Sequence, residues 1–393
     1  MLNLRAKGLK VRVFSRRRTA GVIVIKRGRE RVGHPFGNAL LGLLGASILA
    51  ACVGPAAPRP VTATVPPRPV ANPPAAIPDY NPRSKPSPAL VSVVQQLGRD
   101  FKGNVGIAIR RVDADWTVSW NGTALYPQQS VSKLWVAMAL LDNVDRGKLR
   151  LSDTTTITQR DLTLFHQPTA SLVGKDGWTT SLGNLFTRAM TQSDNTANDT
   201  LLRTVGGPEM VRGFLARRFI SNIRFGPGER LLQATTAGLE WRQDYSIGRN
   251  FYAARSALPM SARNKALDNY LLNPPDGAAP NSIVQALAKL KRGEMLSPAS
   301  TDLLLSTMAE AKTGPQRIKG GVPAGWSYAH KTGTGQDLAP RSTGFNDVGI
   351  MTAPDGTSYA IAVMIGSTTV PIPERWALMQ GVARAVAANH DKY

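Results

Sequence analysis

The sequence predicts an α/β (α+β) fold, in which segments from both ends of the folded region form one antiparallel sheet flanked by helices. Strand-like patterns occur near residues 104–120, give way to a mainly helical stretch at about 150–310, and return after it. Strands separated by a long run of helices favour a sheet with an inserted subdomain. We expect that subdomain to be all-α and to cover roughly residues 150–285.

The first elements follow from local periodicity. Residues 89–101 (ALVSVVQQLGRDF) place apolar side chains at helical spacing, whereas residues 104–112 (NVGIAIRRV) alternate as a strand does. A turn at 113–115 leads into WTVSW at 116–120, which completes a predicted hairpin. The apolar run SVSKLWVAMALLDNV at 130–144 predicts a long, buried helix.

The C-terminal elements are strands followed by a helix. WSYAHKTG at 326–333 reads as one strand, and FNDVGIMT and TSYAIAVMIG are joined by APDG, a strong hairpin signal. The last segment, 373–390, is an amphipathic helix with Pro373 near its first turn. These strands and those near residue 110 supply both halves of the predicted sheet.

Composition excludes several classes of protein. With 393 residues, 42% apolar and 6% aromatic, the chain is neither wholly disordered, nor a coiled coil, nor a polytopic membrane protein. A single cysteine, Cys52, excludes an intramolecular disulfide framework and a multi-cysteine metal site. The sequence has no metal-ligand spacing, phosphate loop or dinucleotide fingerprint, so we expect no metal and no cofactor.

The net charge of +22 is concentrated near the N-terminus. Residues 1–36 hold 11 Lys and Arg and one acid, and an uncharged apolar run follows at 37–51. That run has the length of a signal-peptide core and is short for a spanning helix, so we read 1–51 as a signal segment. A positive net charge is typical of proteins that bind nucleic acid, but nothing else in the sequence supports that function. An exported protein would also not meet nucleic acid, so we do not favour this hypothesis.

The apolar run ends in Leu49-Ala50-Ala51-Cys52, which resembles the lipobox of bacterial lipoproteins. The resemblance implies a lipid on Cys52 and a protein tethered to the inner or outer membrane, facing the periplasm. An uncleaved anchor with an incidental cysteine is the alternative.

A proline-rich segment follows this cysteine. Twelve of the 28 prolines lie within residues 52–88, which predicts an extended, semi-rigid tether. The folded domain is then 89–393.

Ser130-Val131-Ser132-Lys133 forms an SxxK motif at the start of the predicted buried helix. A serine hydroxyl is a poor nucleophile unless a base lies beside it, and an i, i+3 offset places the lysine amine on the same helical face. The spacing is common by chance, so the motif gains weight only from its surroundings.

Ser193-Asp194-Asn195 lies between two helical patterns. On a continuous helix Ser193 and Asn195 would point in different directions, so a shared site requires a bend here. We also expect Asp194 to act as a helix N-cap.

Lys331-Thr332-Gly333 ends a predicted strand and is followed by Thr334. A lysine and a hydroxyl beside a glycine that admits another backbone suit the recognition of an anionic substrate group.

The three motifs in this order resemble those of the serine β-lactamase and penicillin-binding protein superfamily, and over residues 89–393 most of all its class A β-lactamases. The resemblance implies that the motifs converge on one active site between the sheet and the helical subdomain. It implies that Ser130 is the acylated nucleophile, Lys133 its base partner and Ser193 the proton relay to the leaving nitrogen.

The same resemblance assigns the substrate-binding residues. Asn195 would bind the substrate amide, and Lys331 and Thr332 would hold its carboxylate, with Gly333 beside them. The backbone N–H groups of Ser130 and Thr334 would form the oxyanion hole.

A class A enzyme also needs a glutamate that activates the deacylating water. The candidate is Glu229 in FGPGERLLQ, with Glu240 the nearest rival; Gln233 stands where the family has an asparagine and would also hold the water. A solvated loop glutamate paired with Arg230 is the alternative reading of Glu229.

The sequence also departs from the family pattern after Gln233. About 40 residues before Asp276 fill a stretch that is much shorter in typical members. We expect its aromatic residues, Trp241, Tyr245, Phe251 and Tyr270, to form local core.

One arginine and two histidines also bear on the site. Arg341 resembles the family's arginine near the carboxylate pocket. We read His166 and His330 as structural, since the implied scheme needs no histidine.

The resemblance therefore implies a monomeric β-lactamase that takes small-molecule β-lactams, and the N-terminal segment implies that it is exported. The alternative is a D,D-carboxypeptidase or other peptidoglycan-directed serine hydrolase, which needs the same acylation groups without an efficient deacylating glutamate. A non-catalytic lipoprotein that binds the cell wall is a third reading.

Overall fold

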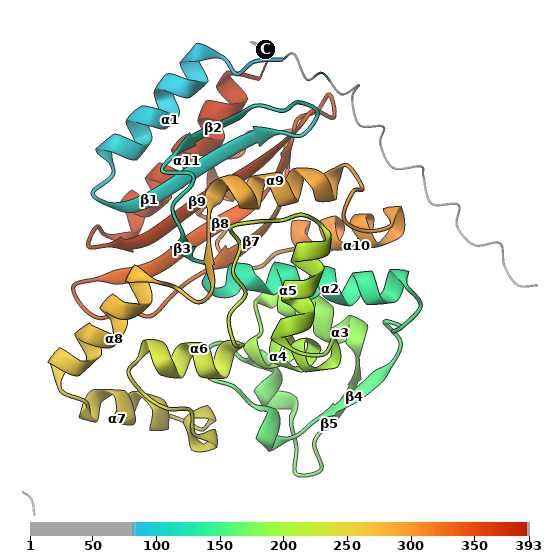
Figure 1. Ribbon diagram of the computed structural model, residues 1–393, viewed down its shortest axis with the longest axis vertical. Coiled ribbons are helices and arrows are strands. Elements are labelled where there is room, and N and C mark those ends of the chain that lie inside the picture. Colours follow the sequence, from blue (N-terminus) through green and yellow to red (C-terminus); the bar gives the residue numbers. More distant parts are fainter. Residues whose placement is uncertain (1–80, 82–83, 391–393) are drawn as a thin grey trace, which may run out of the picture. The chain divides into compact units, whose positions relative to one another are not determined.

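A five-stranded antiparallel sheet organises the protein, whose computed structural model describes residues 81 and 84–390. Strands from the start of the described chain lie beside strands from its end (Figure 1). The spatial order is β2-β1-β9-β8-β7, with bounds Gly103–Arg111 (β1), Thr117–Trp120 (β2), Ser327–Gly333 (β7), Ser342–Thr352 (β8) and Ser358–Thr368 (β9). The predicted sheet built from both ends is thus confirmed.

Both faces of this sheet are covered. Along β1, Ile107 and Ile109 pack beneath α1 (Pro88–Asp100) and α11 (Ile372–Ala388), whereas Ala108 faces the opposite core. That second core includes α9 (Pro280–Lys291) and α10 (Pro298–Ala309). Because alternate residues are buried on both sides, the central strands read as nearly continuous apolar runs.

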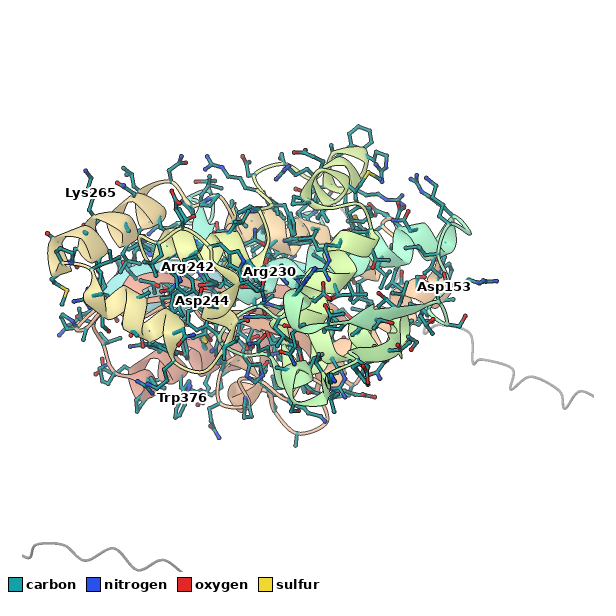
Figure 2. The ribbon with its side chains drawn as sticks, turned by 90° about the horizontal axis from the view of Figure 1, so that it is seen from below. Asp153, Arg230, Arg242, Asp244, Lys265 and Trp376 are labelled. Carbon is teal, nitrogen blue, oxygen red and sulfur yellow. The ribbon has the colours of Figure 1, made fainter. Side chains whose placement is uncertain are left out.

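The inserted subdomain is mainly, but not entirely, helical. Its helices are α3 (Leu182–Thr187), α4 (Asn195–Thr204), α5 (Pro208–Arg217), α6 (Glu229–Thr236), α7 (Asn250–Ala257) and α8 (Met260–Leu272). It also contains the ribbon of β4 (Thr154–Ile157) and β5 (Trp178–Ser181), and a short pair joins β3 (Tyr126–Pro127) to β6 (Gly277–Ala278). Asp153, beside the β4–β5 ribbon, and Lys265 on α8 mark opposite ends of the molecule (Figure 2).

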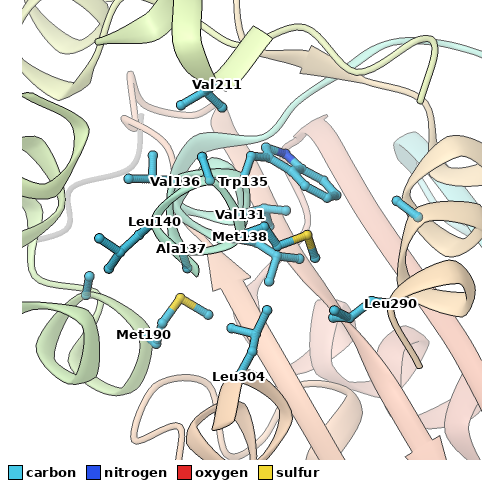
Figure 3. Packing of buried hydrophobic residues seen from close by; sticks show 14 of the residues in the cluster. Val131, Trp135, Val136, Ala137, Met138, Leu140, Met190, Val211, Leu290 and Leu304 are labelled. Carbon is cyan, nitrogen blue, oxygen red and sulfur yellow. The ribbon is translucent and has the colours of Figure 1, made fainter. Parts of the chain in front are cut away.

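Helix α2 (Lys133–Asp145) runs through the core between the sheet and the subdomain. Each residue from 133 to 142 is buried, and Trp135, Met138 and Leu140 contact the surrounding apolar side chains (Figure 3). A helix that is apolar on every side is stable only inside a protein. Its N-terminal end, which bears the SxxK motif, is therefore rigidly placed.

The sequence expectations for the N-terminal region lie mostly outside the described residues. These are the signal segment 1–51, Cys52 and nearly all of the tether 52–88. Within the part of the chain that the structure describes, no helix has the length and hydropathy needed to span a membrane.

Candidate active site

Ser130 lies on a 3-10 turn, Gln129–Ser132, that leads into α2. The predicted continuous α-helix is therefore wrong at this point, but side chains three residues apart are also aligned in a 3-10 helix. The Nζ of Lys133 donates a hydrogen bond to Ser130 Oγ at 2.8 Å. The motif thus places a buried amine against the expected nucleophile, as predicted.

The residue before Ser130 is held in a left-handed conformation. Gln129 has φ +53°, which costs a non-glycine residue about 1 kcal/mol or more. Its N–H donates to Asp276 Oδ2 at 2.8 Å, and its carbonyl accepts from Ser132 Oγ at 2.7 Å. These two bonds hold the turn that presents Ser130.

Glu229 is a buried residue at the first position of α6, only 5% exposed. Its carboxylate forms an ion pair with Lys133 Nζ, and its N–H donates to Asp199 Oδ1 at 3.1 Å. Burial raises the pKa of Glu229, but the charge and hydrogen bond of Lys133 outweigh it and leave the pKa below its ordinary value. The reading as a solvated residue paired with Arg230 is therefore wrong.

Gln233 lies one helical turn after Glu229. Its Nε2 donates to Glu229 Oε2 at 3.1 Å and to Gln129 Oε1 at 2.8 Å. Its Oε1 accepts from Gln336 Nε2 at 3.0 Å. Gln233 therefore connects the glutamate to the turn that carries Ser130.

The chain bends sharply at the SDN motif, as predicted. Ser193 has φ +60° and follows a π-helix, Arg188–Gln192, that the sequence did not reveal. Asp194 caps α4 by accepting from the N–H of Ala197 at 3.0 Å, which confirms the predicted N-cap. Because of the bend, Ser193 Oγ reaches Lys331 Nζ at 2.9 Å.

Asn195 borders the same cleft. Its Nδ2 donates to the carbonyl of Leu164 at 2.9 Å, while its Oδ1 has no hydrogen-bond partner among the described residues. A buried amide oxygen without a donor suits the N–H of a bound molecule.

The KTG motif ends strand β7. Burial, together with the charges of Lys133 and Arg317, lowers the pKa of Lys331 well below its ordinary value. A Cβ at Gly333 would lie 2.3 Å from the carbonyl oxygen of Gln128, so the expected close backbone approach is present. Thr332 and Thr334 line the cleft.

Arg317 is a functional candidate that the sequence analysis missed. Its Nη1 donates to the carbonyl of Gly333 at 2.8 Å, and its Nη2 donates to Thr334 Oγ1 at 2.6 Å. Burial lowers its pKa to about 10, so it keeps its positive charge at neutral pH. The expectation for Arg341 is wrong, because that side chain pairs with Asp268 at 2.6 Å and is not among the cleft residues.

The cleft has a volume of about 490 Å³. Most of the predicted site residues line it: Ser130, Ser193, Asn195, Glu229, Gln233, Thr332 and Thr334. Lys133, Lys331 and Gly333 are buried, and the two lysines contact the lining residues Ser130 and Ser193. His330 is buried against Asp347 at 2.8 Å, as a structural residue would be, but His166 borders the cleft.

The aromatic residues of the enlarged stretch lie as expected. Tyr245 and Phe251 are buried in one cluster, with Trp241 packed against it, and Tyr270 is buried in a neighbouring cluster. Tyr252, which the sequence analysis did not consider, lines the cleft instead.

These residues can perform acyl transfer. A serine that touches a buried lysine, with a carboxylate beyond it, has a path for its proton. Arg317 adds positive charge beside Thr334, and Lys331 adds a buried amine bonded to Ser193, which together favour an anionic substrate. Fold and site together define a serine acyl hydrolase.

Comparison with known proteins identifies the family. Residues 89–390 match the beta-lactamase enzyme family, and the chain belongs to this family as a class A serine β-lactamase.

Similar proteins and a similar solved structure are also named as β-lactamases. The extended-spectrum beta-lactamase PER-1 of Pseudomonas aeruginosa is 28% identical over 71% of this chain and 80% of its own length. Beta-lactamase VEB-1 of the same organism is 26% identical over 70% and 81%. The crystal structure of a beta-lactamase from Chitinophaga pinensis superimposes with a TM-score of 0.63 at 27% identity, covering 77% of this chain and 99% of that one.

Proposed function

We propose that this chain hydrolyses β-lactams in two steps, through an acyl-enzyme on Ser130 that is released by a water activated by Glu229. The observation that carries the proposal is the continuous contact from Ser130 Oγ through Lys133 Nζ to the Glu229 carboxylate. Membership of the β-lactamase family supports the substrate class.

In the acylation step, Lys133 passes a proton to Glu229 and takes the proton of Ser130. The serine oxygen attacks the lactam carbonyl, whose developing negative charge the N–H groups of Ser130 and Thr334 stabilise. When the C–N bond breaks, Ser193 gives its proton to the leaving nitrogen and recovers one through Lys331, to which it is bonded.

Substrate orientation comes from the two ends of the cleft. Thr332, Thr334, the Lys331 amine and the positive charge of Arg317 hold the lactam carboxylate, with Gly333 keeping the strand close to the serine turn. At the other end, Asn195 Oδ1 accepts from the side-chain amide.

Before deacylation, the proton that Glu229 took from Lys133 moves on through water in the cleft and Lys331 to replace the one that Ser193 gave to the nitrogen, so Glu229 is again a carboxylate. In the deacylation step, Glu229 takes a proton from a water that Gln233 helps to hold. The resulting hydroxide attacks the ester carbonyl, Ser130 leaves with a proton from Lys133, and Glu229 returns its proton to Lys133. The family pattern has the shorter side chain of asparagine where this chain has Gln233. Here hydrogen bonds with Glu229, Gln129 and Gln336 fix the position of the Gln233 amide in spite of its longer side chain.

Steady-state hydrolysis of nitrocefin by the purified protein tests this proposal. Ser130→Ala should abolish turnover, and Glu229→Gln should still be acylated but should accumulate a covalent adduct visible in the mass of the intact protein. Glu240→Gln, which changes an exposed glutamate away from the cleft, is the matched control and should behave as wild type. Undiminished turnover in Glu229→Gln would contradict the deacylation step.

A D,D-carboxypeptidase or other peptidoglycan-directed hydrolase is the weaker candidate. It needs no buried glutamate against its lysine, and the relatives are named as β-lactamases. A non-catalytic role is disfavoured, because an idle site has no reason to keep Lys133 and Lys331 buried beside reactive hydroxyls.

We further propose that residues 1–51 direct export, that Cys52 carries a lipid, and that residues 52–88 tether a monomeric catalytic domain, 89–393, in the periplasm. The lipobox-like sequence and the proline density support this arrangement. Cys52→Ser should move activity from the membrane fraction to the soluble fraction. Activity that remains in the membrane fraction would favour an uncleaved anchor.

A further inference from the structure

Helix α7 extends the cleft beyond the predicted site residues. It lies within the segment between Gln233 and Asp276 that is enlarged relative to the family pattern. Two of its residues, Tyr252 and Arg255, line the same cleft as Ser130. The enlargement therefore adds side chains to the substrate-facing wall.

The orientation of α7 follows from how it packs. Phe251 is 2% exposed and is held in a cluster with Leu164 and Tyr245. Residues three apart share one face of a helix, so Tyr252 and Arg255 lie on a common face. The ring of Tyr252 makes an edge contact with Phe165, at 6.0 Å between centroids, and Phe165 also lines the cleft.

Arg255 carries a charge that no neighbouring group neutralises directly. Its Nη2 donates to the backbone carbonyl of Asp337 at 3.0 Å, and its Nε has no hydrogen-bond partner among the described residues. Within that same part of the chain no carboxylate forms an ion pair with it, although the exposed Asp337 side chain contributes a negative charge nearby. Arg255 is partly buried, so a bound anion would be attracted in a low-dielectric setting.

The two cleft arginines contact different points of one chain segment. Arg317 is bonded to Gly333 and Thr334, and Arg255 is bonded to Asp337. Gly333 and Asp337 are four residues apart, up to about 13 Å if that stretch is extended. A substrate that lies along this segment with its ring carboxylate near Arg317 would bring its other end toward Arg255.

We propose that Arg255, with the rings of Tyr252 and Phe165, forms a second anion subsite that binds the acyl side chain of β-lactams bearing an aryl group and a carboxylate. The rings offer an apolar contact for the aryl group, and the guanidinium pairs with the carboxylate. This inference rests on the proposed β-lactamase function, since it concerns the same cleft.

Two penicillins that differ by one carboxylate test the subsite. Carbenicillin is benzylpenicillin with a carboxylate added to the carbon that bears the phenyl ring. In Arg255→Gln, the ratio of kcat/KM for carbenicillin to that for benzylpenicillin should fall about fivefold relative to wild type, as expected for a partly exposed charge pair. In Asp337→Asn, which removes an opposing charge, the ratio should rise.

The control is Lys265→Gln, which removes one positive charge at the periphery of the molecule (Figure 2) and should leave the ratio unchanged. An equal loss for both penicillins, or no change, in Arg255→Gln would overturn the subsite. If the wild type is acylated without turnover, the deacylation proposal fails, but the ratio of acylation rates still decides the role of Arg255.

Discussion

Replacing Asp199 by asparagine should make the protein more stable relative to the wild type as the pH rises from about 4 to neutral. Asp199 is buried on α4, and its Oδ1 accepts from the N–H of Glu229 at 3.1 Å. Burial and the neighbouring charge of Glu229 raise its pKa to about 6. Asparagine keeps the acceptor oxygen and the shape of the side chain, but it removes a negative charge that the folded state disfavours.

The expected size follows from the pKa. A rise in the pKa of Asp199 from 3.8 to about 6 on folding contributes about 3 kcal/mol to the free energy of unfolding while the carboxyl is protonated. The wild type loses this contribution as the pH rises from about 4 through about 6. Below about pH 4 the aspartate is protonated in both the folded and the unfolded state, and this contribution is fully present. An unpaired amide N–H in the variant costs about 1–3 kcal/mol at every pH. The stability difference, variant minus wild type, should therefore grow by about 3 kcal/mol between pH 4 and pH 8.

Urea unfolding followed by tryptophan fluorescence measures this difference at a series of pH values. Asp276, whose pKa burial also raises to about 6, is present in both proteins and so does not affect the comparison. Asp302→Asn, an exposed change on α10, controls for the loss of one negative charge. If the curves for Asp199→Asn and wild type stayed parallel from pH 4 to pH 8, the argument from burial of the carboxylate would be refuted.

Four other substitutions test the packing and charge of the site. Tyr270→Phe leaves an N–H of the Gln129 side-chain amide without its acceptor and should lower the free energy of unfolding by about 2 kcal/mol. Tyr126→Phe removes a buried hydroxyl whose contact with Asn121 is weak, and it should cost less in urea unfolding. Gly333→Ala places a Cβ against a backbone carbonyl and should reduce kcat/KM for nitrocefin at least about tenfold by displacing β7. Arg317→Gln should raise KM about tenfold, measured with benzylpenicillin, by removing a charge from the carboxylate end.

The sequence predicts well which candidate site residues lie together, because each motif encodes its own local geometry. Ser130 and Lys133 are adjacent on one turn, and the bend at Ser193 follows from residues that cannot share a helical face. Arg317 carries no such local signal. It reaches the KTG strand only because the N–H of Ile318 is fixed by Asp347 from β8, at 3.0 Å, and that contact exists only in the folded sheet.

The departures from the family pattern are physically connected. The enlarged segment ends with Tyr270 and Asp276, which bind each other and the side chain and N–H of Gln129. Gln129 in turn accepts from Gln233, the residue that replaces the family's asparagine beside Glu229. A longer amide at 233 can reach Gln129, and Tyr270 supplies the acceptor that orients the Gln129 amide. The enlargement therefore does not loosen the helix that carries Glu229, because it closes a chain of buried hydrogen bonds from that helix to the nucleophile turn.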